Sequence, residues 1–290
     1  MTSLALNLRR WNSTPTALAL AGALVLAGAC GKDDPKGGGG DGSSSGSSSG
    51  DPTTGTTSST TAMADSSSGG VDGSSSSDGG PVVLSISGIA RDFFAMAPLV
   101  GAELSLLDEP GFETVTDDAG NYVIEGLAPD SFHRIAIAGN DSYWGAVVPA
   151  RLGSESLDDY DLSQVSNDVI DIQIGALQMQ DPMVMVDETA AVFLIALRQN
   201  TATGAVVTID PPPPAGTYYA PDASGQPILN QNTIEWGLYP VAIVFNLPPA
   251  PEGTYTISVT HPERECTVED PEPPTFERSI NLVYVDCPAP

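Results

Sequence analysis

The fold class is decided by a short stretch in the first half of the chain, Thr116-Asp117-Asp118-Ala119-Gly120-Asn121-Tyr122. Gly120 and Asn121 tolerate the positive backbone angles of a tight turn, and aspartate side chains accept hydrogen bonds from the backbone of such turns. Strand-like residues precede the turn at 112–115 and follow it at 122–124. We therefore expect a β-hairpin with its turn at residues 117–121.

Further strand patterns extend outward from this turn. Apolar and polar residues alternate over Val82–Ile89, Ala102–Leu106 and Ser131–Ala138, with Gly and Pro between them. Short strands with such punctuation are typical of antiparallel sandwiches. We predict an all-β fold of one or two small antiparallel β-sandwiches. The alternation of the third strand favours a surface or edge position for His133 over the role of a base.

The same residues resemble those of carboxypeptidase regulatory-like domains. The shared elements, in family order and spacing, are Ser87-Gly88-Ile89, Ala97–Ala102, Thr116–Tyr122 and Gly126-Leu127-Ala128-Pro129. The resemblance covers residues 81–150 and implies a transthyretin-like sandwich that carries no catalysis of its own. One departure is Asp130-Ser131-Phe132, where the family usually has glycine before the aromatic residue. We therefore expect a differently built turn at that point.

A weaker internal repeat suggests a second sandwich over residues 186–290. The later segments follow the earlier ones in order: Gly204–Ile209 matches Gly101–Leu106, and Asn246–Pro249 with Gly253–Ile257 matches Gly126–Ile135. The copy begins near the apolar run Val192–Leu197, which suits a central strand, and ends at Ile280–Val285. The pattern favours two sandwiches of one type, and a single larger sandwich is the alternative.

A connector, residues 151–185, lies between the two copies. Its apolar residues recur at helical spacing, namely Val165, Val169, Ile172, Ala176 and Met179. Ser166 is suited to the N-cap and Asp168 to the first turn. The residues Ile170, Ile172 and Ile174 fit a strand equally well, but the spacing favours a short helix packed against the second sandwich.

The N-terminus carries the features of an export signal. Arg9 and Arg10 precede the apolar run Ala17–Ala27, which is too short to span a bilayer, since a spanning helix needs about 20 apolar residues. Residues 1–29 are therefore predicted to be a signal peptide, with an uncleaved anchor as the alternative. Residues 26–30, Leu-Ala-Gly-Ala-Cys, resemble the lipobox of bacterial lipoproteins, although Ala27 stands where leucine is usual. The resemblance implies that Cys30 is acylated.

Residues 30–80 are predicted to be a disordered linker after the lipidated cysteine. They consist mainly of Gly, Ser, Thr and Asp, without aromatic residues, and cannot bury enough apolar surface to offset the entropy of ordering. The residue after Cys30 is Gly31 rather than aspartate. By the lipoprotein resemblance this favours the outer membrane of a Gram-negative-type envelope.

The remaining sequence is strongly acidic. Residues 81–290 contain 30 Asp or Glu and six Arg, without Lys, so the formal balance is 6 − 30 = −24. Such a surface repels phosphate backbones and excludes a nucleic-acid partner. The densest acidic cluster, Asp158-Asp159-Tyr160-Asp161, lacks the spaced ligands of a calcium loop, so a solvated acidic surface is favoured over cation binding.

The use of the three cysteines also indicates an exported protein. With Cys30 assigned to lipid, Cys266 and Cys287 remain as a pair in an exported chain, which predicts a disulfide bond. Metal ligation would need more partners than the sequence offers. The two histidines, His133 and His261, have no metal-ligand spacing, and neither a nucleophile elbow nor a P-loop occurs.

These features predict a non-catalytic envelope lipoprotein without a cofactor or a metal. It would attach to the membrane through its lipid anchor and display β-sandwich modules for structural roles or for contact with an envelope protein. The alternative is a carbohydrate-binding module in which Tyr143, Trp144, Trp236 and Tyr239 stack on sugars. Packing of these aromatic residues in the sandwich core is the competing interpretation.

Overall fold

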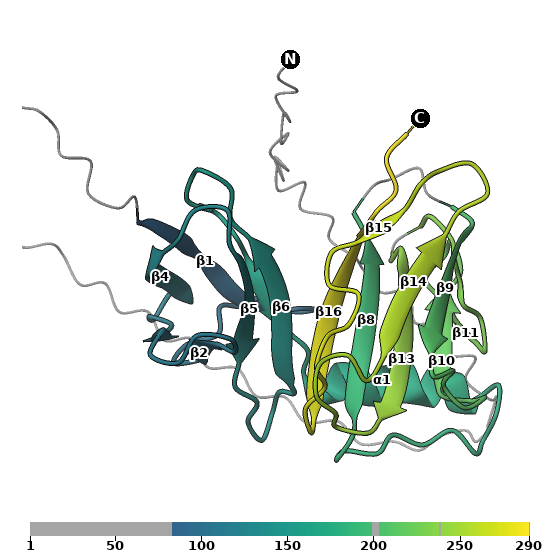
Figure 1. The fold of residues 1–290 in the computed structure, drawn as a ribbon. Helices are drawn as coiled ribbons and strands as arrows, with labels where there is room; N and C mark the ends of the chain where they lie inside the picture. The colour runs from purple at the N-terminus through teal and green to yellow at the C-terminus, as the bar shows by residue number, and fades with distance from the viewer. Residues whose placement is uncertain (1–82, 199–202, 238, 290) are drawn as a thin grey trace, which may run out of the picture. The chain divides into compact units, whose positions relative to one another are not determined.

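The computed structural model describes residues 83–198, 203–237 and 239–289 (Figure 1). All of them belong to one compact unit, Gly73–Pro290. The signal peptide predicted at 1–29, Cys30 and nearly all of the predicted linker at 30–80 fall before that unit, and all lie outside the described residues. The described chain is a β-sandwich protein with one helix, as predicted.

The first sandwich is formed by residues 84–164. One of its sheets has the order β4-β1-β7, with β1 at Leu84–Asp92, β4 at Asn121–Leu127 and β7 at Leu162–Gln164. The facing sheet has the order β6-β5-β2-β3, with β2 at Glu103–Leu106, β3 at Glu113–Val115, β5 at Phe132–Ile137 and β6 at Gly145–Arg151. Alternate apolar side chains from both sheets, among them Ile86, Leu104 and Ile135, fill the core between them.

The predicted hairpin at residues 117–121 is wrong, although the turn itself is present. The Asp117 carboxylate accepts hydrogen bonds from the N–H groups of Ala119 and Asn121, and Gly120 has φ +78°. Strand β3 pairs with β2, however, and β4 pairs with β1 in the other sheet. The turn therefore carries the chain from one sheet to the facing sheet, and Ile124 of β4 packs in the core between the two sheets.

The second sandwich is formed by residues 191–286. Its larger sheet has the order β11-β10-β13-β8-β16, with β8 at Ala191–Leu197, β10 at Tyr218–Pro221, β11 at Pro227–Leu229, β13 at Val241–Leu247 and β16 at Ser279–Asp286. The facing sheet has the order β12-β9-β14, with β9 at Ala205–Asp210, β12 at Thr233–Ile234 and β14 at Thr256–Thr260. The short β15, Thr267–Val268, pairs with the end of β16.

The two sandwiches share one pairing order. In the first, β1 pairs antiparallel with β4 and parallel with β7; in the second, β8 pairs antiparallel with β13 and parallel with β16. The facing sheets contain the antiparallel trios β3-β2-β5 and β12-β9-β14. The apolar run at 191–197 is a central strand, as its composition predicts.

A parallel ladder joins the two sandwiches into one continuous sheet. Strand β6 pairs with β16 from Ser279 opposite Gly145 to Asn281 opposite Val147. Leu282 and Tyr284 of β16 pack against the core of the first sandwich. This ladder covers the second edge of β6, and β5 lies inside the sheet between β2 and β6. The expectation of a surface position for His133 is therefore wrong, since its side chain is only 1% exposed.

The connecting helix, α1, spans Asn167–Gln178. Ser166 occupies the N-cap position but makes no side-chain capping hydrogen bond, and Asp168 lies in the first turn. Leu177 packs in a cluster with Tyr219 and Phe245, so the helix covers the second sandwich. The segment is therefore a helix, as its apolar spacing predicts, and not the strand that Ile170, Ile172 and Ile174 would also fit. No helix among the described residues is long and apolar enough to cross a membrane.

Candidate functional site

The four predicted ligand-binding residues do not line one common hollow. Tyr143 hydrogen-bonds Asp92, and burial together with this carboxylate raises the pKa of the tyrosine. The ring of Tyr239 lies 6.4 Å from that of Phe93, the residue after Asp92. Tyr143 and Tyr239 therefore both neighbour the corner at the end of β1. Trp236 is 37% exposed, and its backbone N–H donates to Thr203 Oγ1.

Trp144 is buried beside a hollow along helix α1. The indole is only 3% exposed, yet it lines a hollow of about 320 Å³. The remaining lining comes from one side of the helix and the segment after it: Asn167, Ile170, Asp171, Ile174, Gln178, Met185, Val186 and Glu188. The carboxylates and amides of this lining can hydrogen-bond a polyhydroxylated ligand, whereas the buried indole leaves little ring face for stacking.

A buried arginine cluster lies at the junction of the two sandwiches. Arg134 of β5 is 6% exposed and makes a bidentate pair with Asp270, at 2.7 Å from Nε and 3.0 Å from Nη2. Nη2 also donates to Glu252 at 2.8 Å, and Nη1 donates to Asp108 at 3.2 Å. The hydrogen bond to Asp270 is the largest cause that raises the pKa of Arg134. The guanidinium thus holds one carboxylate of its own sandwich and two of the second.

Sequence patterns do not identify this cluster. Arg134 falls within the strand predicted at Ser131–Ala138, and its partners lie 26, 118 and 136 residues away. The usable signal was an arginine within an otherwise apolar strand segment, His133-Arg134-Ile135-Ala136-Ile137, because a charge in such a position needs partners.

A second arginine bridges the sandwiches at the start of β16. Arg278 donates from Nη1 to the Asn140 carbonyl at 2.7 Å and from Nη2 to Asn167 Oδ1 at 3.1 Å. Its own carbonyl accepts the N–H of Gly145, the first residue of β6. Arg278 therefore ties the ladder between β6 and β16 to both the β5–β6 loop and the helix.

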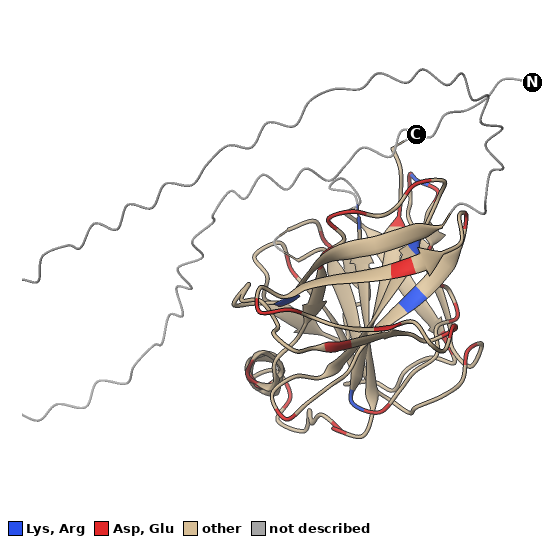
Figure 2. Cartoon of the chain, turned by 90° about the vertical axis from the view of Figure 1, so that its left-hand side faces the viewer, with Lys and Arg blue, Asp and Glu red and all other residues tan. Residues whose placement is uncertain are grey.

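All six arginines of the described residues are engaged within the fold. Besides Arg134 and Arg278, Arg91 pairs with Asp161, Arg151 stacks on Phe132, Arg198 pairs with Glu269, and Arg264 donates to the Cys287 carbonyl. Basic residues are correspondingly sparse among the acidic ones in Figure 2. The surface of this part of the chain is left with an excess of carboxylates.

Three side chains have the order of a hydrolytic triad. His133 Nε2 lies 2.7 Å from Ser131 Oγ, and Nδ1 lies 3.2 Å from Glu109 Oε1. The serine hydroxyl also lies 2.6 Å from the Ala128 carbonyl, so two acceptors compete for its single proton. The contact of Nδ1 with Glu109 lacks hydrogen-bond geometry. This arrangement favours a structural role, in which Ser131 fixes the turn before β5, over an activated nucleophile.

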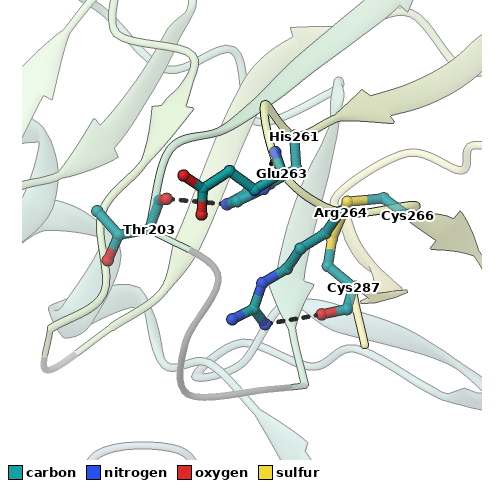
Figure 3. The surroundings of a disulfide bond; sticks show 6 residues. All are labelled: Thr203, His261, Glu263, Arg264, Cys266 and Cys287. Atoms are coloured by element: carbon teal, nitrogen blue, oxygen red, sulfur yellow. Dashed lines mark hydrogen bonds between the residues drawn. A yellow bond between two sulfur atoms is a disulfide. The ribbon is translucent and has the colours of Figure 1, made fainter. Parts of the chain in front are cut away.

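The predicted disulfide is confirmed. Cys266 and Cys287 are bonded, which fixes the loop after β14 to the end of β16 (Figure 3). Nearby, His261 Nε2 contacts the Thr203 carbonyl at 3.0 Å, and its Nδ1 accepts the N–H of Glu263. Both ring nitrogens are therefore engaged with the backbone, which suits a structural role rather than a base.

The acidic cluster at 158–161 is used locally. Asp158 accepts a hydrogen bond from Ser87, and Asp161 accepts the N–H of Ile89 and pairs with Arg91 at 3.6 Å. Tyr160 between them is buried, which raises the pKa of its hydroxyl. Within the described residues, no group of three His, Cys, Asp or Glu side chains is placed to hold a metal ion.

No protein-family model matches the chain, and no curated protein matches it in sequence. Similar solved structures include the Bacillus anthracis TIE protein, at 15% identity and TM-score 0.24, covering 71% of this chain and 34% of that one. A streptococcal ancillary pilin has 12% identity and TM-score 0.24, covering 71% and 62%. The shaft pilin SpaA from Lactobacillus rhamnosus GG has 9% identity and TM-score 0.23, covering 72% and 99%. The chain thus spans about a third of the first protein and less than two thirds of the second.

Proposed function

We propose that this chain is a non-catalytic, lipid-anchored envelope protein that displays two joined β-sandwiches for structural or protein-interaction roles. The observation that carries the proposal is the junction. Strands β6 and β16 form one sheet, and Arg134 and Arg278 each contact both sides of it. A joint built in this way holds two modules in a fixed relation, which suits presentation of a surface to a partner.

The remaining parts of the proposal come from the N-terminal sequence. Lipid on Cys30 would anchor the protein in the outer membrane, and the linker up to residue 80 would hold the sandwiches away from the bilayer. The first sandwich would be a carboxypeptidase regulatory-like module. Its partner would be another envelope protein, whose contact surface must tolerate an excess of carboxylates.

Substitution Cys30→Ser tests the anchor. The variant should leave the membrane fraction and appear in the soluble envelope fraction, with the same thermal unfolding curve as the wild type, because the sandwiches do not contain Cys30. A variant that stays with the outer membrane after washes without detergent contradicts the proposal.

The absence of catalysis is tested at the serine. A fluorophosphonate probe should leave Ser131 unlabelled, because its hydroxyl proton is shared with the Ala128 carbonyl. Labelling that disappears in both Ser131→Ala and His133→Gln variants would establish an active nucleophile instead.

The hollow beside Trp144 supports a second candidate, carbohydrate binding. A glycan array probed with the full chain should then give binding that is lost in the double variant Asp171→Asn/Glu188→Gln, since both side chains line the hollow. The matched control is Asp168→Asn, an exposed carboxylate of the same helix that does not line it. No binding by the wild type, or equal loss in the control, rejects this candidate.

A further inference from the structure

Three exposed methionines are gathered after helix α1. Met179, Met183 and Met185 are 81%, 81% and 70% exposed. Half of the six methionines of the chain thus fall within seven residues. Exposed apolar side chains in such a group usually mark a binding site rather than packing.

Two buried residues, Leu177 and Val184, anchor the segment that carries the three methionines. The two belong to the same core cluster and are 0% and 4% exposed. Leu177 lies two residues before Met179, and Val184 lies between Met183 and Met185. Val184 is buried while its neighbours Met183 and Met185 are exposed, so both methionines face away from the core. Gln178 Nε2 donates to the Val184 carbonyl at 2.9 Å, which links the residue before Met179 to the residue between Met183 and Met185.

The loop that carries these methionines is fixed at several points. The Asp181 N–H donates to the Leu177 carbonyl, and the Val184 N–H donates to the Asp181 carbonyl, which closes a turn with Pro182 at its second position. The Gln180 side chain donates to the Pro227 carbonyl at 2.6 Å and accepts the N–H of Leu229 at 3.0 Å. The loop is thus tied to β11 and is organised before any ligand arrives.

The chemistry of the group selects a soft cation. Thioether sulfur is a neutral, polarisable ligand that suits Cu(I), whereas Mg²⁺, Ca²⁺ and Mn²⁺ prefer oxygen ligands. The same loop carries Asp181, Asp187 and Glu188, whose charges draw cations toward it. We propose that Met179, Met183 and Met185 bind Cu(I), or its redox-inert analogue Ag(I), through three thioether sulfurs.

Titration with Ag⁺ tests the site. The full chain carrying Cys30→Ser, which removes the one cysteine outside the disulfide, is titrated with silver nitrate in chloride-free buffer and followed by calorimetry. One ion should bind per chain, and the triple variant Met179→Leu/Met183→Leu/Met185→Leu should bind none. Each single leucine substitution should weaken binding by about tenfold, or about 1.4 kcal/mol. Leucine keeps the apolar volume, so a loss reports on sulfur.

Two controls make the outcome decisive. Met96→Leu removes a methionine that is 59% exposed but lies outside the group, and this variant should bind Ag⁺ like the wild type. In methyl NMR of the wild type, the signals of Met179, Met183 and Met185 should shift with added Ag⁺, while that of Met96 stays in place. Absent binding, equal loss in Met96→Leu, or unchanged binding by the triple variant overturns the proposal.

Discussion

The two sandwiches share a pairing order but complete their second sheets in different ways. In the first, β5 pairs with β6 over six residue pairs, from Phe132 opposite Arg151 to Ile137 opposite Ala146. In the second, β14 pairs with β9 and has no second strand partner within the described part of the chain. The segment after β15 follows it instead, with the Ile257 N–H donating to the Pro271 carbonyl and the Gly253 N–H to the Glu272 carbonyl.

The proline residues after β15 explain why the second sandwich lacks a counterpart of β6 among its described residues, and β6 itself joins the two sandwiches. Prolines at 271, 273 and 274 lack the N–H that a ladder requires, so the sheet ends at β14, and the disulfide holds the segment in place. Strand β6 has a second edge with free donors and acceptors, which pairs with β16. Strand β6 of the first sandwich thus joins the two sandwiches by pairing with β16. In the second sandwich, the proline-rich segment beside β14 adds no further strand to the sheet.

The largest effect should come from breaking the junction. Arg134→Met leaves Asp270, 7% exposed, buried without its partner, and the free energy of unfolding should fall by about 3–5 kcal/mol in urea denaturation. The control is Arg91→Met, whose pair with Asp161 is partly exposed and should be worth about 1 kcal/mol or less. The double variant Arg134→Met/Asp270→Leu should recover most of the loss. An Arg134→Met variant no less stable than Arg91→Met contradicts this account of the junction.

Removing the disulfide should affect the second sandwich selectively. Cys266→Ser/Cys287→Ser frees a loop closed over 21 residues, which costs about 3 kcal/mol in the chain-entropy model. Hydrogen exchange should accelerate in β14 and at the end of β16, with little change in β1 and β4. Uniform acceleration across both sandwiches would mean that the disulfide supports the junction rather than the proline-rich segment.

A smaller effect is expected at equivalent turns. Asp130 has φ +55° and Gly253 has φ +78°, so the first sandwich places an aspartate in the left-handed conformation where the second has glycine. The two copies thus share this backbone conformation. That the turn differs from that of carboxypeptidase regulatory-like domains stays a prediction. Asp130→Gly should stabilise by about 0.5 kcal/mol and Gly253→Asp should destabilise by a similar amount, measured by thermal unfolding. The same sign for both substitutions would contradict the equivalence of the turns.

The smallest effect concerns Glu252 of the Arg134 cluster and Glu269, which pairs with Arg198. The hydrogen bond from Arg134 lowers the pKa of Glu252, so this group stabilises the fold at neutral pH, and that contribution is lost as pH falls through the lowered pKa. Burial raises the pKa of Glu269, so its contribution is present at acidic pH and is lost as pH rises through the raised pKa. Carboxyl NMR should show Glu252 titrating at lower pH than Glu269. The reverse order would contradict the environments described for the two carboxylates.

The candidate site was less predictable from sequence than the fold. Aromatic residues were identified at 143, 144, 236 and 239, but only Trp144 lines the hollow. Asp171 and Glu188, which share that hollow, are distant in sequence from Trp144, and no local pattern relates them. Arg134 was placed on a strand without partners, because those partners come from three separate loops.

By itself the sequence determined much of the local structure: strands such as those at 84–92, 103–106 and 191–197, the turn at 117–121, the helix after Ser166 and the bond between Cys266 and Cys287. Periodicity, backbone preference and cysteine number depend on near neighbours or on composition, so they can be read from residues. Only the tertiary structure decided that β3 and β4 enter different sheets, that β6 pairs with β16, and that His133 is buried. Strand partners are chosen by which arrangement buries the apolar faces of the whole fold at once, and no single segment contains that information.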